Sequence, residues 1–247
     1  MTYCLAMRLD EGLVFLSDTR TNAGVDNVGI YRKLFVFHPA PDRTFVIQSA
    51  GNLATTQEVM DRIGRDLAHP DGRDSLATVE HLFEAALYLG RLSVQVAAEH
   101  RPALSAVGVD GTSTFILGGQ IAAEPPDILL VYPEGNYIRA SDDRPFLQIG
   151  ETKYGKFLLE LATQAHLPIE SAAKVALSSM VSTAHANLSV GPPYDLGLYR
   201  TATHELRHGR ITEGSTFLDR LQDVWAQHLT RALQDLPMVE PDDIKLA

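Results

Sequence analysis

The strands and helices that this sequence predicts come in blocks and do not alternate along the chain. Hydrophobic runs with period two, bounded by turn residues, indicate strands, and apolar residues at helical spacing indicate helices. The expected order is strands, two helices, strands, two helices, a hairpin and a last helix, over residues 2–48, 53–67 and 76–100, 113–149, 151–164 and 169–187, 195–212, and 215–236. Parallel strands would need a helix between each neighbouring pair, so this order favours antiparallel sheets.

Two antiparallel sheets packed face to face, with a pair of helices outside each sheet, would bury the apolar side of every element. We therefore predict an α/β (α+β) fold with four layers in the order α-β-β-α. A chain of 247 residues is ample for one such core, and no linker or low-complexity tract interrupts it.

Composition excludes several classes of protein. The net charge of −10, from 31 acidic and 21 basic residues, argues against a nucleic-acid-binding surface. No stretch approaches the roughly 18 apolar residues of a membrane span, so no membrane partner is expected. Cys4 is the single cysteine and no disulfide can form within the chain, which is typical of a reducing compartment. We therefore expect a cytoplasmic protein.

Thr2 is the residue that points most directly to a reaction. It follows Met1 and begins the first strand-like run. If Met1 is removed, Thr2 carries a hydroxyl nucleophile and an α-amine base on one residue. An α-amine has a pKa of about 7.7–8.0 in model peptides, so part of it is neutral near pH 7. A Met-Thr start is common by chance, however, and other residues must support this interpretation.

Further motifs resemble those of proteasome β-type subunits over residues 2 to about 212. They are Thr2, the turn Asp10-Glu11-Gly12, Ser17-Asp18-Thr19-Arg20, Lys33, Ser49-Ala50-Gly51, Gly118-Gly119, Tyr132-Pro133-Glu134-Gly135 and Ile149-Gly150. The start Met-Thr-Tyr-Cys, the run from Ser17 to Asp26 and the run Asn187-Leu188-Ser189-Val190-Gly191-Pro192-Pro193 are most similar to the bacterial proteasome-related family called Anbu.

This resemblance implies an N-terminal-nucleophile (Ntn) hydrolase fold with one proteasome β-subunit-like domain over residues 1–247, of which about 213–247 form a C-terminal helical extension. It also implies self-association into a large homo-oligomer, either a ring or an open spiral. The implied activity is that of a threonine peptidase acting on peptides or unfolded proteins inside that oligomer, after Met1 is removed. The sequence leaves open whether an ATPase feeds the chamber.

The resemblance gives roles to individual residues. Thr2 would be the nucleophile. Lys33 would keep the α-amine neutral and stabilise alkoxide on Thr2, because a nearby ammonium disfavours a second positive charge. Asp18 would pair with Lys33, since a buried lysine without a counter-ion tends to lose its proton. Arg20 would either join these charges or fix the following loop.

Two more residues complete the expected site. Gly51 would present its main-chain N–H as an oxyanion hole, because a strand end without a Cβ allows close approach. Ser189 would be a supporting polar residue near the end of the fourth helix. Thr21 and the main chain near Gly51 would pair with an extended substrate. The base of the substrate pocket is either Asn52 or a residue near Ile30-Tyr31.

Two departures from the proteasome pattern affect the expected activity. Glu151 and Thr152 follow Ile149-Gly150, where proteasome subunits have a serine, and Ala186 stands where they have an aspartate. Because these residues orient the amine and a water in proteasomes, their loss could reduce turnover, and Glu151 is a candidate polar substitute. Two alternatives therefore stay open: a weakly active or inactive scaffold subunit, and an Ntn amidase for a small peptide-like substrate.

No metal or cofactor is expected. His204 and His208 are four residues apart but lie in a strand-and-turn segment without a carboxylate or thiolate pattern. Gly118-Gly119 lacks the flanking residues of a phosphate-binding loop and is interpreted as the turn at a strand end.

Overall fold

The computed structural model describes residues 2–22, 28–69 and 74–240 of the 247-residue chain. The chain divides into two compact units, Met1–Thr212 and Glu213–Ala247. The described part of the first unit holds two five-stranded antiparallel sheets, a short two-stranded hairpin and four helices.

The first sheet has the order β10-β1-β2-β11-β12, formed by Phe146–Gly150, Tyr3–Leu9, Gly12–Asp18, Tyr194–Arg200 and Glu205–Ile211. The second sheet has the order β5-β6-β7-β8-β9, formed by Leu34–Ala40, Arg43–Gly51, Ser113–Ile121, Asp127–Val131 and Tyr137–Arg139. The hairpin pairs β3 with β4, which are Arg20–Asn22 and Val28–Ile30. The helices of this unit are α1, α2, α3 and α4, which are Leu53–Ala68, Leu82–Ala106, Lys153–Ala162 and Ile169–Ala186.

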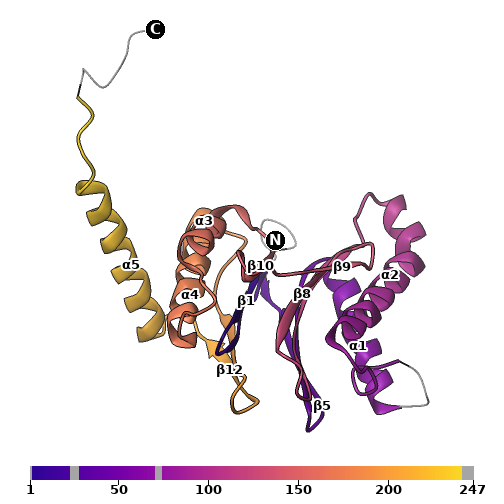
Figure 1. The fold of residues 1–247 in the computed structure, drawn as a ribbon. Helices are drawn as coiled ribbons and strands as arrows, with labels where there is room; N and C mark the ends of the chain where they lie inside the picture. Colours follow the sequence, from indigo (N-terminus) through magenta and orange to yellow (C-terminus); the bar gives the residue numbers. More distant parts are fainter. Residues whose placement is uncertain (1, 23–27, 70–73, 241–247) are drawn as a thin grey trace. The chain divides into compact units, whose positions relative to one another are not determined.

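The two sheets lie face to face, α1 and α2 cover the outer face of the β5–β9 sheet, and α3 and α4 lie on the outer side of the other sheet (Figure 1). One buried cluster fills the space between the sheets and includes Ala6, Phe15, Ile116 and Ile128. The predicted four-layer α-β-β-α fold is therefore confirmed.

Strand β6 shows how one segment serves two layers. Val46 belongs to the cluster between the sheets, whereas its neighbours Phe45 and Ile47 pack with α1 and α2 in a second cluster. Successive side chains of a strand point to opposite faces, so a strand buried on both sides needs apolar residues at consecutive positions. This explains the uninterrupted run Phe45-Val46-Ile47.

The second helix begins later than predicted. Ser75, the expected N-cap, instead closes a separate turn in which its Oγ accepts a hydrogen bond from the N–H of Ala77 at 3.2 Å. Helix α2 starts at Leu82, where Glu84 Oε2 accepts from the N–H of His81 at 3.0 Å. The acidic residue of the first turn therefore marks the true start. The helix then continues past Pro102 to Ala106, beyond the predicted end at residue 100.

The prediction that Gly118-Gly119 forms a turn is wrong, because β7 runs through both residues to Ile121. A Cβ on Gly118 would lie 2.5 Å from the Phe15 ring, and one on Gly119 would lie 2.0 Å from the carbonyl oxygen of Thr44. These glycines allow close approach of neighbouring strands and side chains inside the fold.

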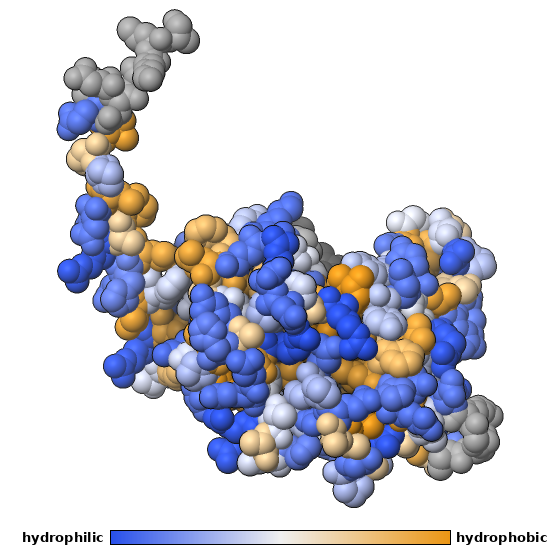
Figure 2. Space-filling view, viewed as in Figure 1, coloured by the Kyte–Doolittle hydropathy of each residue, from blue (hydrophilic) through white to orange (hydrophobic). Residues whose placement is uncertain are grey.

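The second unit is described by one helix, α5 (Thr216–Gln234). The Ser215 side chain caps it by accepting a hydrogen bond from the N–H of Leu218 at 3.3 Å. Both hydrophobic and hydrophilic residues are seen on the surface of α5 (Figure 2). Across the residues described, no helix is both long enough and apolar enough to cross a membrane.

Candidate active site

Thr2 lies directly before β1, and its main chain is held by the end of β10. Its carbonyl oxygen accepts a hydrogen bond from the N–H of Glu151 at 2.7 Å. Gly150 has φ +83°, and a Cβ at this position would lie 1.9 Å from the same oxygen. Only a glycine at residue 150 allows this close approach, so the Ile149-Gly150 pair has a direct part in placing Thr2.

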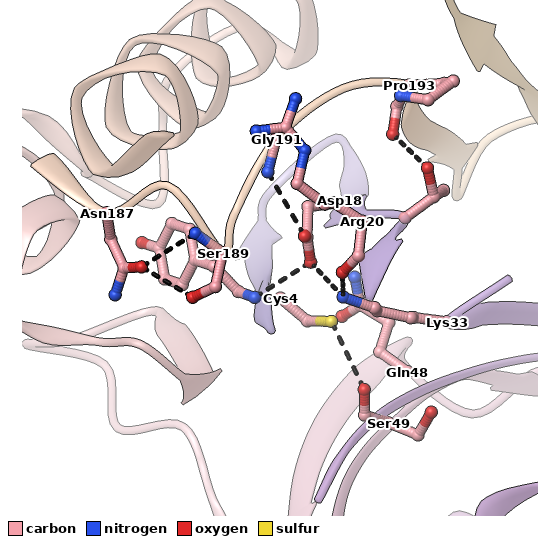
Figure 3. Close-up of polar contacts among 12 residues, drawn as sticks. Cys4, Asp18, Arg20, Lys33, Gln48, Ser49, Asn187, Ser189, Gly191 and Pro193 are labelled. Carbon is pink, nitrogen blue, oxygen red and sulfur yellow. Dashed lines mark hydrogen bonds and ion pairs between the residues drawn. The ribbon is translucent and has the colours of Figure 1, made fainter. Parts of the chain in front are cut away.

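Asp18 ends β2 and connects the residue after Thr2 to Lys33. Its side chain is fully buried, and Oδ1 accepts hydrogen bonds from the N–H of Tyr3 at 3.0 Å and from Lys33 Nζ at 2.8 Å. Oδ2 accepts from the N–H of Gly191 at 3.4 Å. Burial raises the pKa of the Asp18 carboxyl, whereas Lys33 and the two main-chain donors oppose that rise. These contacts surround Asp18 in Figure 3.

Lys33 is buried just before β5, with 4% of its surface exposed. Its main-chain oxygen accepts from the N–H of Ser49 at 3.0 Å, which attaches this segment to β6. Besides Asp18, Nζ donates to the carbonyl oxygen of Arg20 at 2.6 Å. The structure therefore brings Lys33, Asp18 and the main chain of Arg20 together, and the pairing of Asp18 with Lys33 is the one that the family resemblance implied.

The side chain of Arg20 points to the loop after α4. Its Nη1 donates to the carbonyl oxygen of Leu188 at 3.1 Å, and a Cβ on Gly191 would lie 2.3 Å from its guanidinium carbon. Nearby, Thr19 Oγ1 donates to the carbonyl oxygen of Pro193 at 2.7 Å. These side-chain contacts fix the loop Leu188–Pro193. The expected contact of Arg20 with the loop that follows it falls on residues 23–27, which lie outside the described residues.

Thr2, Lys33 and Gly51 line one cleft of about 720 Å³. Gly51 ends β6 with φ +119°, and a Cβ there would lie 2.5 Å from the carbonyl oxygen of Thr112. The backbone at Gly51 is thus both conformationally restricted and open to the cleft. The other residues around this cleft are Thr21, Ser49, Ala50, Asn52, Leu53, Thr56, Val109, Asp110, Thr112, Gly150 and Glu151.

Ser189 does not line this cleft. Hydrogen bonds through Asn187 and Glu151 connect Ser189 to the cleft. Its N–H and Oγ both donate to Asn187 Oδ1, at 3.0 and 2.6 Å. Asn187 Nδ2 in turn donates to Glu151 Oε2 at 3.0 Å. The two positions that depart from the proteasome pattern are therefore linked, because Glu151 contacts the residue next to Ala186.

The wall made by Val109, Asp110 and Thr112 was not predicted. Asn52 holds it, since Asn52 Nδ2 donates to the carbonyl oxygen of Asp110 at 3.0 Å and Asn52 Oδ1 caps α1 at the N–H of Thr55. An asparagine directly before a helical pattern is a recognisable N-cap signal, but its second contact, to a segment 58 residues away, has no local signature. Of the two candidates for the pocket base, Asn52 lines the cleft and Ile30-Tyr31 does not.

Thr21 lines the cleft and belongs to the β3–β4 hairpin. The N–H of Tyr31 donates to the carbonyl oxygen of Thr19, and Thr21 stands opposite Gly29. Hydrogen-bonded pairs alternate along an antiparallel ladder, so Thr21 and Gly29 form the next such pair. The pairing of Thr21 with an extended substrate stays a prediction.

No cluster of three or more His, Cys, Asp or Glu side chains suited to a metal ion occurs among the residues with described positions.

Searches against protein-family models and against curated proteins find no match to this chain. Solved structures do match. The Anbu complex from Pseudomonas aeruginosa, solved as a helical assembly, is 39% identical with a TM-score of 0.91, covering 98% of this chain and 99% of that one. Anbu from Yersinia bercovieri, described as an ancestral β-subunit, is 39% identical with a TM-score of 0.88, covering 97% and 99%. Anbu from Hyphomicrobium sp. strain MC1 is 40% identical with a TM-score of 0.86, covering 97% and 100%.

Proposed function

Because the chain belongs to the Anbu family of proteasome β-subunit-like proteins, we propose that it is an Ntn threonine hydrolase, with Thr2 as its nucleophile once Met1 is removed. One observation carries the proposal. The main chain directly after Thr2 is hydrogen-bonded to Asp18, and the same carboxylate oxygen holds the buried ammonium of Lys33. A buried ion pair is costly to build, and it is placed here beside a residue that can carry both nucleophile and base.

The proposed reaction begins with attack of Thr2 Oγ on a peptide carbonyl carbon. The Oγ proton passes to the α-amine of Thr2, and the Oγ–C bond forms a tetrahedral oxyanion that the Gly51 N–H stabilises. Collapse breaks the C–N bond, and the proton passes from the α-ammonium to the leaving amine. Water then hydrolyses the acyl ester and regenerates Thr2.

We propose an extended peptide or an unfolded protein segment as the substrate. The cleft lies between the β3 hairpin, which contributes Thr21, and the end of β6, which contributes Gly51, and its about 720 Å³ is enough for a few side chains. An amidase acting on a small peptide-like compound would use the same nucleophile, and a comparison of peptide and small-amide substrates separates the two activities.

We also propose that the chain self-associates and works in the cytoplasm. The support for self-association is the helical assembly of the relative from Pseudomonas aeruginosa. Light scattering of the purified protein and electron microscopy test it: particles much larger than the 27.1 kDa chain are expected. A monomer at micromolar concentration would contradict self-association.

The function is tested on protein whose first residue is Thr2, made as a cleavable fusion. Intact mass is measured with and without a peptide epoxyketone or boronate, which react with N-terminal threonine. The unmodified sequence should gain one equivalent of the epoxyketone, and Thr2→Ala should gain none. If verified Thr2-first protein stays unlabelled and hydrolyses no peptide while still assembling, the chain is a scaffold subunit, the alternative that the Glu151 and Ala186 departures favour.

A further inference from the structure

Glu151 is fixed against the residue that the proposed function makes the nucleophile. Its N–H donates to the Thr2 carbonyl oxygen at 2.7 Å, and both residues line the same cleft. Gly150, the residue before Glu151, packs its Cα against the Thr2 carbonyl group. The main chain of residues 150 and 151 therefore lies directly beside Thr2. The Glu151 side chain therefore branches from main chain that touches Thr2.

The Glu151 carboxylate is also oriented. A main-chain N–H can only donate, so the Asn187 atom facing the N–H of Ser189 must be the amide oxygen. This fixes the amide and aims its NH₂ group at Glu151 Oε2, at 3.0 Å. No other hydrogen bond to this carboxylate is formed within the described part of the chain, so its second oxygen retains the capacity to accept one.

The charges around Thr2 make Glu151 the important acidic neighbour. Lys33 is compensated by Asp18, and the Arg20 guanidinium lies against the loop at Leu188 and Gly191. Asp110, the other carboxylate among the described residues of the cleft, accepts from both the N–H and the Oγ1 of Thr112, at 2.9 and 3.0 Å. Among the described residues that line the cleft, the carboxylate with an acceptor position left for a cation at Thr2 is therefore that of Glu151.

We propose that the Glu151 carboxylate accepts a hydrogen bond from the α-ammonium group of Thr2 and, held by Asn187, orients that group toward the Thr2 hydroxyl. Glu151 is a positioning residue in this scheme, and it also sets the pH at which Thr2 becomes reactive. A nearby carboxylate favours the charged form of an amine, which opposes the effect of Lys33. The proposal rests on the proposed function only in requiring that Thr2 carry a free amine.

In the reaction, Glu151 neither gains nor loses a proton. The proton that leaves Thr2 Oγ forms the α-ammonium, which Glu151 stabilises until the proton passes to the leaving amine. Glu151 thus lowers the energy of the protonated amine. For the same reason, the amine loses its proton and can act as a base only at a higher pH.

The test measures protonation of the amine directly. Thr2-first protein is acetylated with a limiting pulse of acetic anhydride from pH 5 to 10, and mass spectrometry of the N-terminal peptide gives the midpoint of the labelling curve. Glu151→Gln should lower this midpoint by about one pH unit, so that roughly ten times more amine is neutral well below it. Because hydrolysis is not measured, the result is independent of whether the protein cleaves peptides.

Asp110→Asn is the matched control, since it removes one charge from the same cleft, and its midpoint should move much less. Glu151→Asp should restore part of the shift, and circular dichroism verifies that all variants fold. An unchanged or higher midpoint in Glu151→Gln overturns the proposal. An equal shift in Asp110→Asn also overturns it, because the effect would then be general to negative charge in the cleft.

Discussion

Asp18 and Lys33 form an ion pair from which water is nearly excluded: their side chains are 0% and 5% exposed, and Oδ1 and Nζ are 2.8 Å apart. The pair joins the end of β2 to the segment before β5, which belong to different sheets. It therefore fixes the two sheets relative to each other at the edge where Thr2 lies.

Removing one member of this pair should be far more harmful than removing both. Lys33→Ala should lower the free energy of unfolding by about 3–5 kcal/mol, because the Asp18 carboxylate is left buried and uncompensated. Lys33→Met combined with Asp18→Asn should recover much of that loss in stability. Labelling of Thr2 by the epoxyketone should be lost in the single variant and in the double variant. Urea unfolding of the variants measures the difference.

An exposed ion pair is the control for the Lys33 and Asp18 variants. Arg91 and Asp74 have side chains that are 57% and 72% exposed, so Arg91→Ala should change the free energy of unfolding by less than about 1 kcal/mol. A Lys33→Ala variant as stable as Arg91→Ala would show that Asp18 is not held as a charged group in the folded protein.

Gly51 should not tolerate a methyl group. Gly51→Ala forces an L side chain into φ +119° and places its Cβ 2.5 Å from the Thr112 carbonyl oxygen, so β6 or the Val109–Thr112 wall must move. We expect a loss of about 1–3 kcal/mol in unfolding free energy and at least a tenfold slower reaction with the epoxyketone. Thermal denaturation and the time course of labelling measure the two effects.

Gly64→Ala is a control for the glycine change itself. Gly64 lies within α1, and a Cβ there has no atom within 4 Å, so alanine should stabilise the protein by about 0.5–1 kcal/mol. If Gly51→Ala behaves in the same way, the strain inferred at the end of β6 is absent.

The layered fold could be predicted because it depends on local patterns. Strand runs such as Phe45-Val46-Ile47 and helix faces such as Val59, Met60 and Ile63 carry their own periodicity. The predicted start of the second helix and the predicted turn at Gly118-Gly119 were wrong because the same residue type can serve two different structural roles. Ser75 is a good N-cap residue that here closes an isolated turn, and Gly118-Gly119 is a turn-like pair that here allows close packing in a strand.

The site was less predictable than the fold. The approach of Asp18 and Lys33 came from a family resemblance, and the structure then placed the two side chains together. The contact between Glu151 and Asn187 joins residues 36 apart in the chain and depends on how β10 and the end of α4 meet. No periodicity encodes such a contact, because it is a product of tertiary packing.

Arg20 should affect the loop after α4 more than it affects Thr2. Arg20→Ala removes the hydrogen bond to Leu188 and leaves space beside Gly191. We expect faster amide hydrogen exchange in residues 188–191 and a loss of about 1.5 kcal/mol in stability. Arg20→Lys should be intermediate, since an ammonium keeps the charge but lacks the planar guanidinium. Exchange followed by mass spectrometry measures the effect.

Arg207 provides the comparison for that experiment, because it is 77% exposed and pairs with Glu205 on its own strand. Arg207→Ala should leave exchange in residues 188–191 unchanged. If Arg20→Ala also leaves it unchanged, then contacts other than the guanidinium hold this loop.

Tyr3 should make the fold sensitive to alkaline pH. It is fully buried, its hydroxyl lies 2.8 Å from Ser179 Oγ, and burial raises its pKa from an ordinary 10.0 to about 12. The folded state therefore retains a proton that the unfolded state loses above pH 10. Stability from this group is fully present below about pH 10 and is lost as pH rises through about 12, by about 2–3 kcal/mol.

Tyr3→Phe tests this linkage, because phenylalanine keeps the ring and removes the proton. The difference in unfolding free energy between Tyr3→Phe and the unmodified protein should be constant up to about pH 10 and then move in favour of Tyr3→Phe by about 2–3 kcal/mol as pH approaches 12. Urea unfolding at half-unit steps of pH measures it. Tyr154→Phe, at a tyrosine that is 45% exposed on α3, is the matched control because it removes a phenol outside the core. Parallel curves for Tyr3→Phe and the unmodified protein across this range would mean that the Tyr3 hydroxyl loses its proton as readily in the folded state as in the unfolded one.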